Sequence, residues 1–67
     1  MNLEIPYTVQ INELVIKIRD ENPNADNFEL KRIFENKYRC KMIVKKWFIT
    51  CIQFESEQDL ILFLLKL

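Results

Sequence analysis

The sequence predicts an α+β domain: two N-terminal helices and an apolar C-terminal helix pack on a small antiparallel β-hairpin or bent strand pair. Three observations lead to this prediction. Two helical repeats are separated by a proline break, a β-branched and aromatic stretch spans residues 40–54, and a capped apolar run follows that stretch. Helices and strands that occur in separate blocks along a chain are typical of the α+β class.

The first eight residues are expected to be extended or irregular, because Pro6 disfavours a helical conformation of the residue before it. Residues 9–21 are predicted to form a helix. Their apolar residues recur at i, i+3, i+4 and i+7, as expected for one helical face, and these are Ile11, Leu14, Val15 and Ile18. A strand is the alternative for residues 9–21, because apolar residues also alternate there and β-branched residues are frequent.

The tripeptide Asn22-Pro23-Asn24 marks a break, since the residue before proline avoids the α region and asparagine tolerates turn geometry. Asp26 and Glu29 then have the spacing of a capping box, in which each side chain accepts from a free amide at the start of a helix. The second helix is expected to run to about Tyr38. Its apolar side carries Leu30, Ile33, Phe34 and Tyr38.

Residues 40–54 are too long for an average strand, so we expect a hairpin. The turn is predicted near Lys45-Lys46, although tight hairpin turns favour Asn-Gly or Asp-Gly, and a wider loop or one long bent strand is the alternative. A turn at this position would make Cys40 and Cys51 cross-strand neighbours. We nevertheless expect free thiols, because directly opposed strand positions rarely match disulfide geometry.

Ser56, followed by Glu57 and Asp59, has the pattern of a helix N-cap with acidic residues in the first turn. The predicted helix covers residues 57–66 and is apolar nearly all round, which indicates burial on more than one side. A chain of 67 residues has little interior. We therefore expect a homodimer in which the C-terminal helix contributes Leu60, Phe63, Leu64 and Leu67 to self-association.

The composition excludes several classes of site. The chain has no glycine, which phosphate-binding loops of the Walker and Rossmann types require. It has no histidine and one serine, so a serine–histidine or cysteine–histidine arrangement cannot form within one chain. Two cysteines without histidine do not supply the four ligands of a structural zinc site. We expect one domain, residues 1–67, with no enzymatic activity, no metal and no cofactor.

The N-terminal residues lack the basic and apolar regions of a signal peptide, and the longest apolar run, residues 60–65, is too short to span a bilayer. We therefore expect a cytoplasmic protein with no membrane partner and with reduced cysteines.

Charge is segregated although the net charge is zero. Residues 31–46, called the basic band below, contain seven basic residues and one acidic residue. The expected contacts with a partner are Lys37, Arg39, Lys41, Lys45, Lys46 and Trp47. The alternative function is a small nucleic-acid-binding regulator, in which the basic band contacts phosphates and aromatic side chains stack on bases. A solvated face whose lysines protect a strand edge is the third interpretation.

The C-terminal third resembles the endings of many short accessory proteins of tailed bacteriophages. The resemblance rests on Trp47-Phe48-Ile49-Thr50, on Phe54-Glu55-Ser56-Glu57-Gln58-Asp59 and on Phe63-Leu64-Leu65-Lys66-Leu67. Leu60 and Ile61 depart from the pattern, because such proteins tend to have small residues there. The resemblance implies a viral accessory protein in the host cytoplasm. We expect a small non-enzymatic interaction or modulator protein, an inhibitor for example, that binds a host or viral protein as a dimer.

Overall fold

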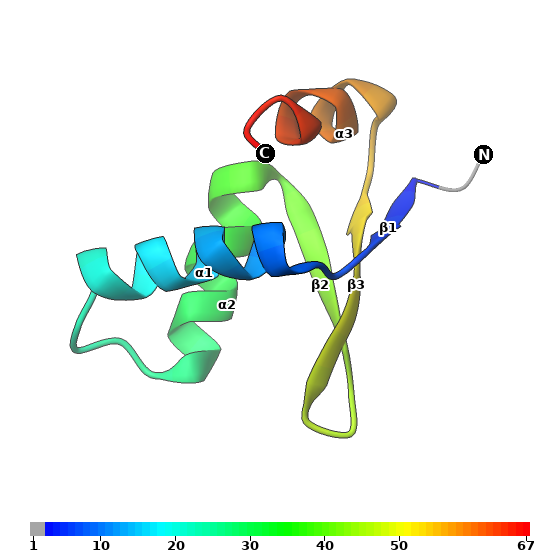
Figure 1. The fold of residues 1–67 in the computed structure, drawn as a ribbon. Coiled ribbons are helices and arrows are strands. Elements are labelled where there is room, and N and C mark those ends of the chain that lie inside the picture. Colours follow the sequence, from blue (N-terminus) through cyan, green and yellow to red (C-terminus); the bar gives the residue numbers. More distant parts are fainter. Residues whose placement is uncertain (1–2) are drawn as a thin grey trace.

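The computed structural model describes residues 3–67 and confirms the α+β class. Within these residues, three helices and an antiparallel three-stranded sheet occur in separate blocks (Figure 1). The elements are β1 (Glu4–Pro6), α1 (Val9–Glu21), α2 (Asn27–Tyr38), β2 (Cys40–Lys45), β3 (Phe48–Phe54) and α3 (Glu57–Leu64). Residues 9–21 are therefore helical, and the alternative of a strand for them is wrong.

All three helices begin at a side chain that accepts a backbone hydrogen bond. Thr8 Oγ1 accepts from the amide of Ile11 at 3.3 Å, and Asp26 Oδ1 accepts from that of Glu29 at 2.8 Å. Ser56 Oγ accepts from the amide of Asp59 at 3.1 Å, which confirms the predicted cap of the last helix. These caps fix where each helix starts, because they satisfy amides that have no partner inside the helix.

Strand β3 lies in the centre of the sheet, between β1 and β2, and all pairs are antiparallel. The sequence indicated only extended or irregular backbone for residues 1–8, so the short edge strand β1 was missed. It has three residues and includes a proline, so it carries no periodic signal. Its position depends on pairing with β3, for example Ile5 opposite Ile52.

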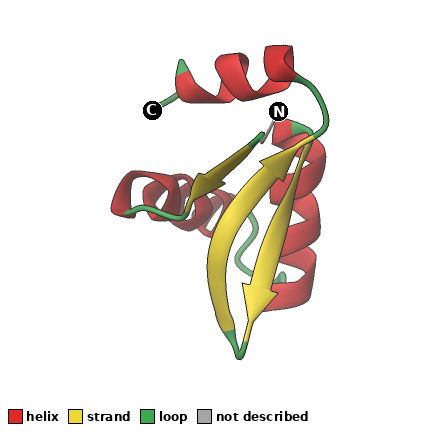
Figure 2. Cartoon of the chain, turned by 90° about the vertical axis from the view of Figure 1, so that its right-hand side faces the viewer, coloured by secondary structure: helices red, strands yellow, loops and turns green. Residues whose placement is uncertain are grey.

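The helices α1 and α2 cover one face of the sheet, and the other face is open (Figure 2). The core between them consists of apolar side chains from every helix and from β2 and β3. The buried residues are Ile11, Ile18, Leu30, Phe34, Met42, Ile52, Phe54 and Phe63. On the open face the exposed residues include Glu4, Lys41 and Gln53, which occupy neighbouring positions in register across the three strands.

The hairpin turn lies at Lys46-Trp47, one residue later than predicted. Both residues have positive φ, 49° for Lys46 and 78° for Trp47. Two positive φ values are the geometry of a type I′ turn, which suits the twist of a hairpin and favours Asn-Gly. The predicted position was therefore wrong by one residue. The chain has no Asn-Gly or Asp-Gly pair to mark the turn, and Lys46 and Trp47 adopt the tight turn although neither residue favours it.

The register also differs from the prediction, and Cys40 and Cys51 are not cross-strand neighbours. Cys40 lies opposite Phe54, whereas Cys51 lies opposite Ile43. The shift comes from the later turn and from a β-bulge next to Ile43, where β3 contains one extra residue, Thr50. Cys40 and Cys51 are free thiols, as expected.

Beyond the bulge the hairpin continues as a two-stranded projection that extends past the first turn of α2 (Figures 1 and 2). We call residues 44–49 the hairpin arm. Its tip residue, Trp47, is 95% exposed. The bulge adds local twist and bends its strand, so it sets the direction in which the hairpin arm leaves the sheet.

Relieving the backbone of the tip is expected to stabilise the fold. A non-glycine residue with left-handed backbone geometry costs about 1–2 kcal/mol, and Asn-Gly is the favoured pair for this turn. The double substitution Lys46→Asn with Trp47→Gly should raise the free energy of unfolding by about 1–2 kcal/mol, measured by urea denaturation followed by circular dichroism. Lys45→Asn, which lies in regular strand geometry, should give no gain. Equal stability of the double variant and the wild type would contradict this turn geometry.

Candidate interaction site

The six residues expected to contact a partner fall into two groups in the structure. Lys37, Arg39 and Lys41 lie near the junction of α2 and β2. Lys45, Lys46 and Trp47 lie at the far end of the hairpin arm (Figure 1). A partner that contacts one group therefore approaches a different end of the molecule from a partner that contacts the other.

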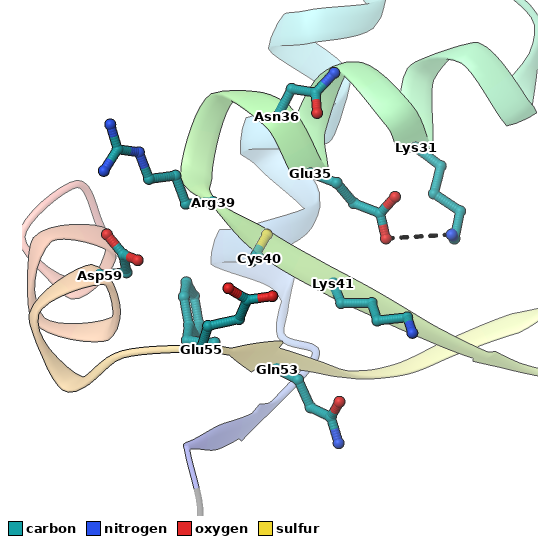
Figure 3. Close-up of a pocket in the computed structure, with 10 residues that line it drawn as sticks. Lys31, Glu35, Asn36, Arg39, Cys40, Lys41, Gln53, Glu55 and Asp59 are labelled. Atoms are coloured by element: carbon teal, nitrogen blue, oxygen red, sulfur yellow. Dashed lines mark hydrogen bonds and ion pairs between the residues drawn. The ribbon is translucent and has the colours of Figure 1, made fainter.

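Two residues of the first group, Arg39 and Lys41, line an open groove of about 790 Å³ at the edge of β2 (Figure 3). We call it the edge groove. It is lined by three cationic side chains, Lys31, Arg39 and Lys41, and by three carboxylates, Glu35, Glu55 and Asp59. Because positive and negative charges are balanced, the edge groove lacks the excess of cations that phosphate backbones attract.

Glu35 has a structural role in the edge groove. Its Oε2 accepts a hydrogen bond from the backbone amide of Met42 at 2.9 Å and one from Lys31 Nζ at 3.2 Å. Met42 belongs to the edge strand β2, whose outward amides would otherwise offer a template for pairing with another chain. Glu35 therefore protects this edge and also fixes the position of β2 against α2.

The thiol of Cys40 in the edge groove is not activated. Burial, and second the nearby negative charge of Glu35, raise the pKa of Cys40 to about 12. The thiolate is the nucleophilic form of cysteine, so Cys40 stays protonated and unreactive at neutral pH.

The second cysteine lies on the open face of the sheet. Cys51 Sγ donates a hydrogen bond to Glu4 Oε1 at 2.8 Å, which links the central strand to β1. This bond to Glu4 is the main cause of a raised pKa of Cys51, and burial also raises it. A weak bond from Thr50 Oγ1, at 3.8 Å from the sulfur, acts in the opposite direction.

Removing the Glu4 charge is expected to increase the reactivity of Cys51. In Glu4→Gln the carboxylate no longer stabilises the protonated thiol, so the pKa of Cys51 falls and more thiolate is present at pH 8. Alkylation of Cys51 by iodoacetamide, followed by peptide mass spectrometry, should then be several-fold faster. Glu13→Gln, an exposed position on α1, should leave the rate unchanged. An unchanged rate in Glu4→Gln would show that Glu4 does not control this thiol.

The basic band does not form one continuous field. Lys31 is paired with Glu35 at 3.2 Å, and Lys37 Nζ lies 5.7 Å from the centre of the Tyr38 ring, a cation–π distance. Lys41 is an exposed residue of β2 at the edge groove, whereas Lys46 is at the tip of the hairpin arm. The sequence therefore overstated how closely these charges lie together.

The expected self-association residues separate into an inner and an outer pair. Phe63 is 2% exposed, and its ring lies 5.1–6.0 Å from the rings of Phe34, Tyr38 and Phe54. Leu60 is partly buried against the same core. Phe63 is therefore occupied by its own chain and cannot form the outer contact that the sequence suggested, whereas Leu60 stays partly exposed. Leu64 and Leu67 remain exposed.

The outer side of the last helix exposes large aliphatic side chains. We call this surface the α3 outer face, and it consists of Ile61, Leu62, Leu64, Leu65 and Leu67. Leu65 is 77% exposed. Within its own chain α3 buries only the side that carries Phe63 and Leu60. The prediction that this helix is buried on more than one side is therefore not met by a single copy.

A second groove, of about 600 Å³, lies between the hairpin arm and helices α1 and α2. We call it the aromatic groove, because Tyr7, Phe28 and Trp47 line it. Of these three residues, the sequence identified only Trp47 as a contact. Phe28 had a visible signal, since it is a large aromatic residue outside the apolar repeat of its helix. Tyr7 directly follows β1, whose pairing with β3 places Tyr7 in the groove. The sequence contains no signal for β1.

No three side chains of the metal-binding types gather anywhere in residues 3–67. In that same part of the chain, each helix falls short of the length and apolar character that crossing a membrane requires. Comparisons with protein-family models, with curated proteins and with solved structures give no match to this chain.

Proposed function

We propose that this protein is a small non-enzymatic interaction protein that forms a homodimer through the α3 outer face and binds another protein. The observation that carries the proposal is the exposure of five large aliphatic side chains on one helix and its C-terminal turn. Monomeric proteins rarely expose a contiguous apolar patch of this kind, and such patches usually mark interfaces. The resemblance to phage accessory proteins points to a host or viral protein as the partner.

The occupant of the α3 outer face is proposed to be the same face of a second copy. The five residues are all uncharged and aliphatic, so the face is complementary to itself, as a two-fold interface requires. A small domain also gains from such a dimer, because it buries a modest share of its own surface. Phe63, on the opposite side of the helix, packs on Phe34 and Phe54 and holds α3 against the domain.

Light scattering at micromolar concentration tests self-association directly. We expect a mass of twice 8.2 kDa, falling to the monomer value on dilution. A stable species of 8.2 kDa would remove the dimer from the proposal. It would leave the binding of another protein to be tested separately.

A second candidate, nucleic-acid binding, rests on the shape and charge of the hairpin arm. A two-stranded ribbon fits the major groove of DNA, and this one carries Lys45 and Lys46 beside an exposed Trp47. Charge-driven binding would weaken steeply with salt, with a slope near −0.9 per phosphate contacted on duplex DNA. Absence of binding to duplex and single-stranded oligonucleotides at low salt, measured by fluorescence anisotropy, would remove this candidate.

A further inference from the structure

We propose that the aromatic groove binds a segment of the partner protein in which a large apolar side chain lies next to an acidic one. This inference names the site and the chemistry of the partner, so it rests on the proposed binding of another protein. It does not depend on the dimer, because no residue of the α3 outer face lines the aromatic groove.

The walls of the aromatic groove carry large apolar side chains, which indicate that the bound segment contributes an apolar side chain. One wall is the hairpin arm, with Val44 and Trp47, and another is the first turn of α2, with Phe28. Phe28 is 74% exposed and Trp47 is 95% exposed. Exposed aromatic residues on both sides of a groove are typical of binding hot spots, where they pack around an inserted side chain. Both rings are therefore largely open to solvent in the free protein.

The charged side chains in the aromatic groove are all positive, which indicates that the bound segment contributes an acidic side chain. The charged residues that line it are Arg19 and Lys31, and no carboxylate lines it. Lys31 is already paired with Glu35. Within residues 3–67, no carboxylate lies within ion-pair distance of Arg19. The guanidinium is therefore available for a carboxylate from outside, with which it can form a bidentate pair.

The Tyr7 side chain in the groove is held in place before any partner binds. Tyr7 donates a hydrogen bond from its hydroxyl to Asn12 Oδ1 at 2.6 Å, which fixes the ring and leaves the Asn12 amide nitrogen as a donor. Burial raises the pKa of Tyr7, and the positive charge of Arg19, which lines the same groove, acts against this rise. A groove with fixed donors beside apolar walls loses little freedom on binding.

Selection from a random heptapeptide library tests the proposed chemistry. The intact protein is immobilised, and enriched peptides are resynthesised with capped ends. We expect the enriched peptides to pair an aromatic or large aliphatic residue with Asp or Glu. Replacing that acidic residue by its amide should weaken binding about five- to tenfold, because the charge-assisted hydrogen bonds to Arg19 are lost. Enrichment of basic peptides, or of none, would overturn the proposal.

Matched variants locate the peptide on the protein. Arg19→Gln should abolish the preference for the acidic residue, whereas Arg32→Gln, an exposed arginine outside the groove, should preserve it. Phe28→Ser should weaken binding at least tenfold, whereas Phe48→Ser, at a site of nearly equal exposure that does not line the groove, should not. The same affinity in Arg19→Gln and Phe28→Ser as in the wild type would overturn the groove as the binding site. If these peptides bound elsewhere, the proposed interaction function would survive.

Trp47 gives an internal optical signal, since it is the one tryptophan of the chain and it lines the groove. Peptide binding should shift its emission to shorter wavelength as the ring leaves water. A shift that appears without peptide as the protein concentration rises would show that a second copy fills the groove, which would overturn an external partner. A shift produced by oligonucleotides but not by peptides would likewise overturn the proposal, in favour of nucleic acid.

Discussion

Phe63→Ala is expected to lower the free energy of unfolding by about 3–5 kcal/mol, the usual range for removing a buried phenylalanine ring. The ring is 2% exposed and contacts aromatic side chains from both α2 and β3. Stability near 0.05–0.15 kcal/mol per residue gives a chain of this length about 3–10 kcal/mol in total. The substitution should therefore remove at least about a third of the stability, and all of it at the lower end of that range, and release α3 from the domain.

Urea denaturation followed by circular dichroism measures this loss. Phe28→Ala is the matched control, because it deletes the same atoms at a position that is 74% exposed, and surface changes usually stay within about 0.5 kcal/mol. A loss below about 1 kcal/mol in Phe63→Ala would mean that the ring does not anchor the last helix. The comparison is made at one protein concentration, because self-association adds to apparent stability.

Leu65 lies only two residues after Phe63. The substitution Leu65→Asp is expected to abolish the proposed dimer while the domain stays folded. A fully buried leucine contributes about 1.5–3 kcal/mol relative to an exposed one, and a two-fold dimer contains the substitution twice. The loss is then at least about 3 kcal/mol, which weakens the dimer at least about 100-fold. The monomer should tolerate the change because Leu65 is 77% exposed within its own chain.

Analytical ultracentrifugation and urea denaturation separate the two effects of this substitution. Ile16→Asp is the control, since Ile16 is another exposed aliphatic residue, 42% accessible on α1 and outside the α3 outer face. A Leu65→Asp protein that remains dimeric would move the interface away from α3. A Leu65→Asp protein that unfolds even at low concentration, where the wild type is monomeric, would show that Leu65 supports the domain itself.

Together, Phe63→Ala and Leu65→Asp separate the two sides of one short helix. The sequence shows a run of apolar residues from Leu60 to Leu65 and suggests that the helix is buried on more than one side. The structure assigns Phe63 to the core and Leu65 to the surface. A continuous apolar run has no periodicity that identifies its inner side, so that orientation came only from packing against Phe34 and Phe54.

The aromatic groove shows the same limit for a binding site. Trp47 could be chosen from the sequence as an exposed aromatic contact, but its neighbours could not. Tyr7, Arg19 and Phe28 come from three separate segments, and they meet only because β1 pairs with β3 and α2 packs beside α1. Pairing and packing between distant segments carry no local pattern in a single sequence.

The sequence by itself determined the α+β class, the bounds of the first two helices and the caps Asp26 and Ser56. These features depend on interactions within a few residues, either the 3.6-residue repeat of one face or a side chain that satisfies an amide three residues away. They could therefore be derived from the order of residues along the chain.

Only the tertiary structure decided the strand register. A turn at Lys45-Lys46 would direct Trp47 and Cys51 to the core face, whereas the observed turn and bulge direct Ile52 and Phe54 there. Shifting a strand by one residue exchanges its two faces. Burying Ile52 and Phe54 contributes about 1.5–3 kcal/mol each, which offsets the cost of about 1–2 kcal/mol for each left-handed residue of the turn at Lys46-Trp47. Core burial, rather than turn chemistry, therefore set the hairpin and pointed Trp47 into solvent.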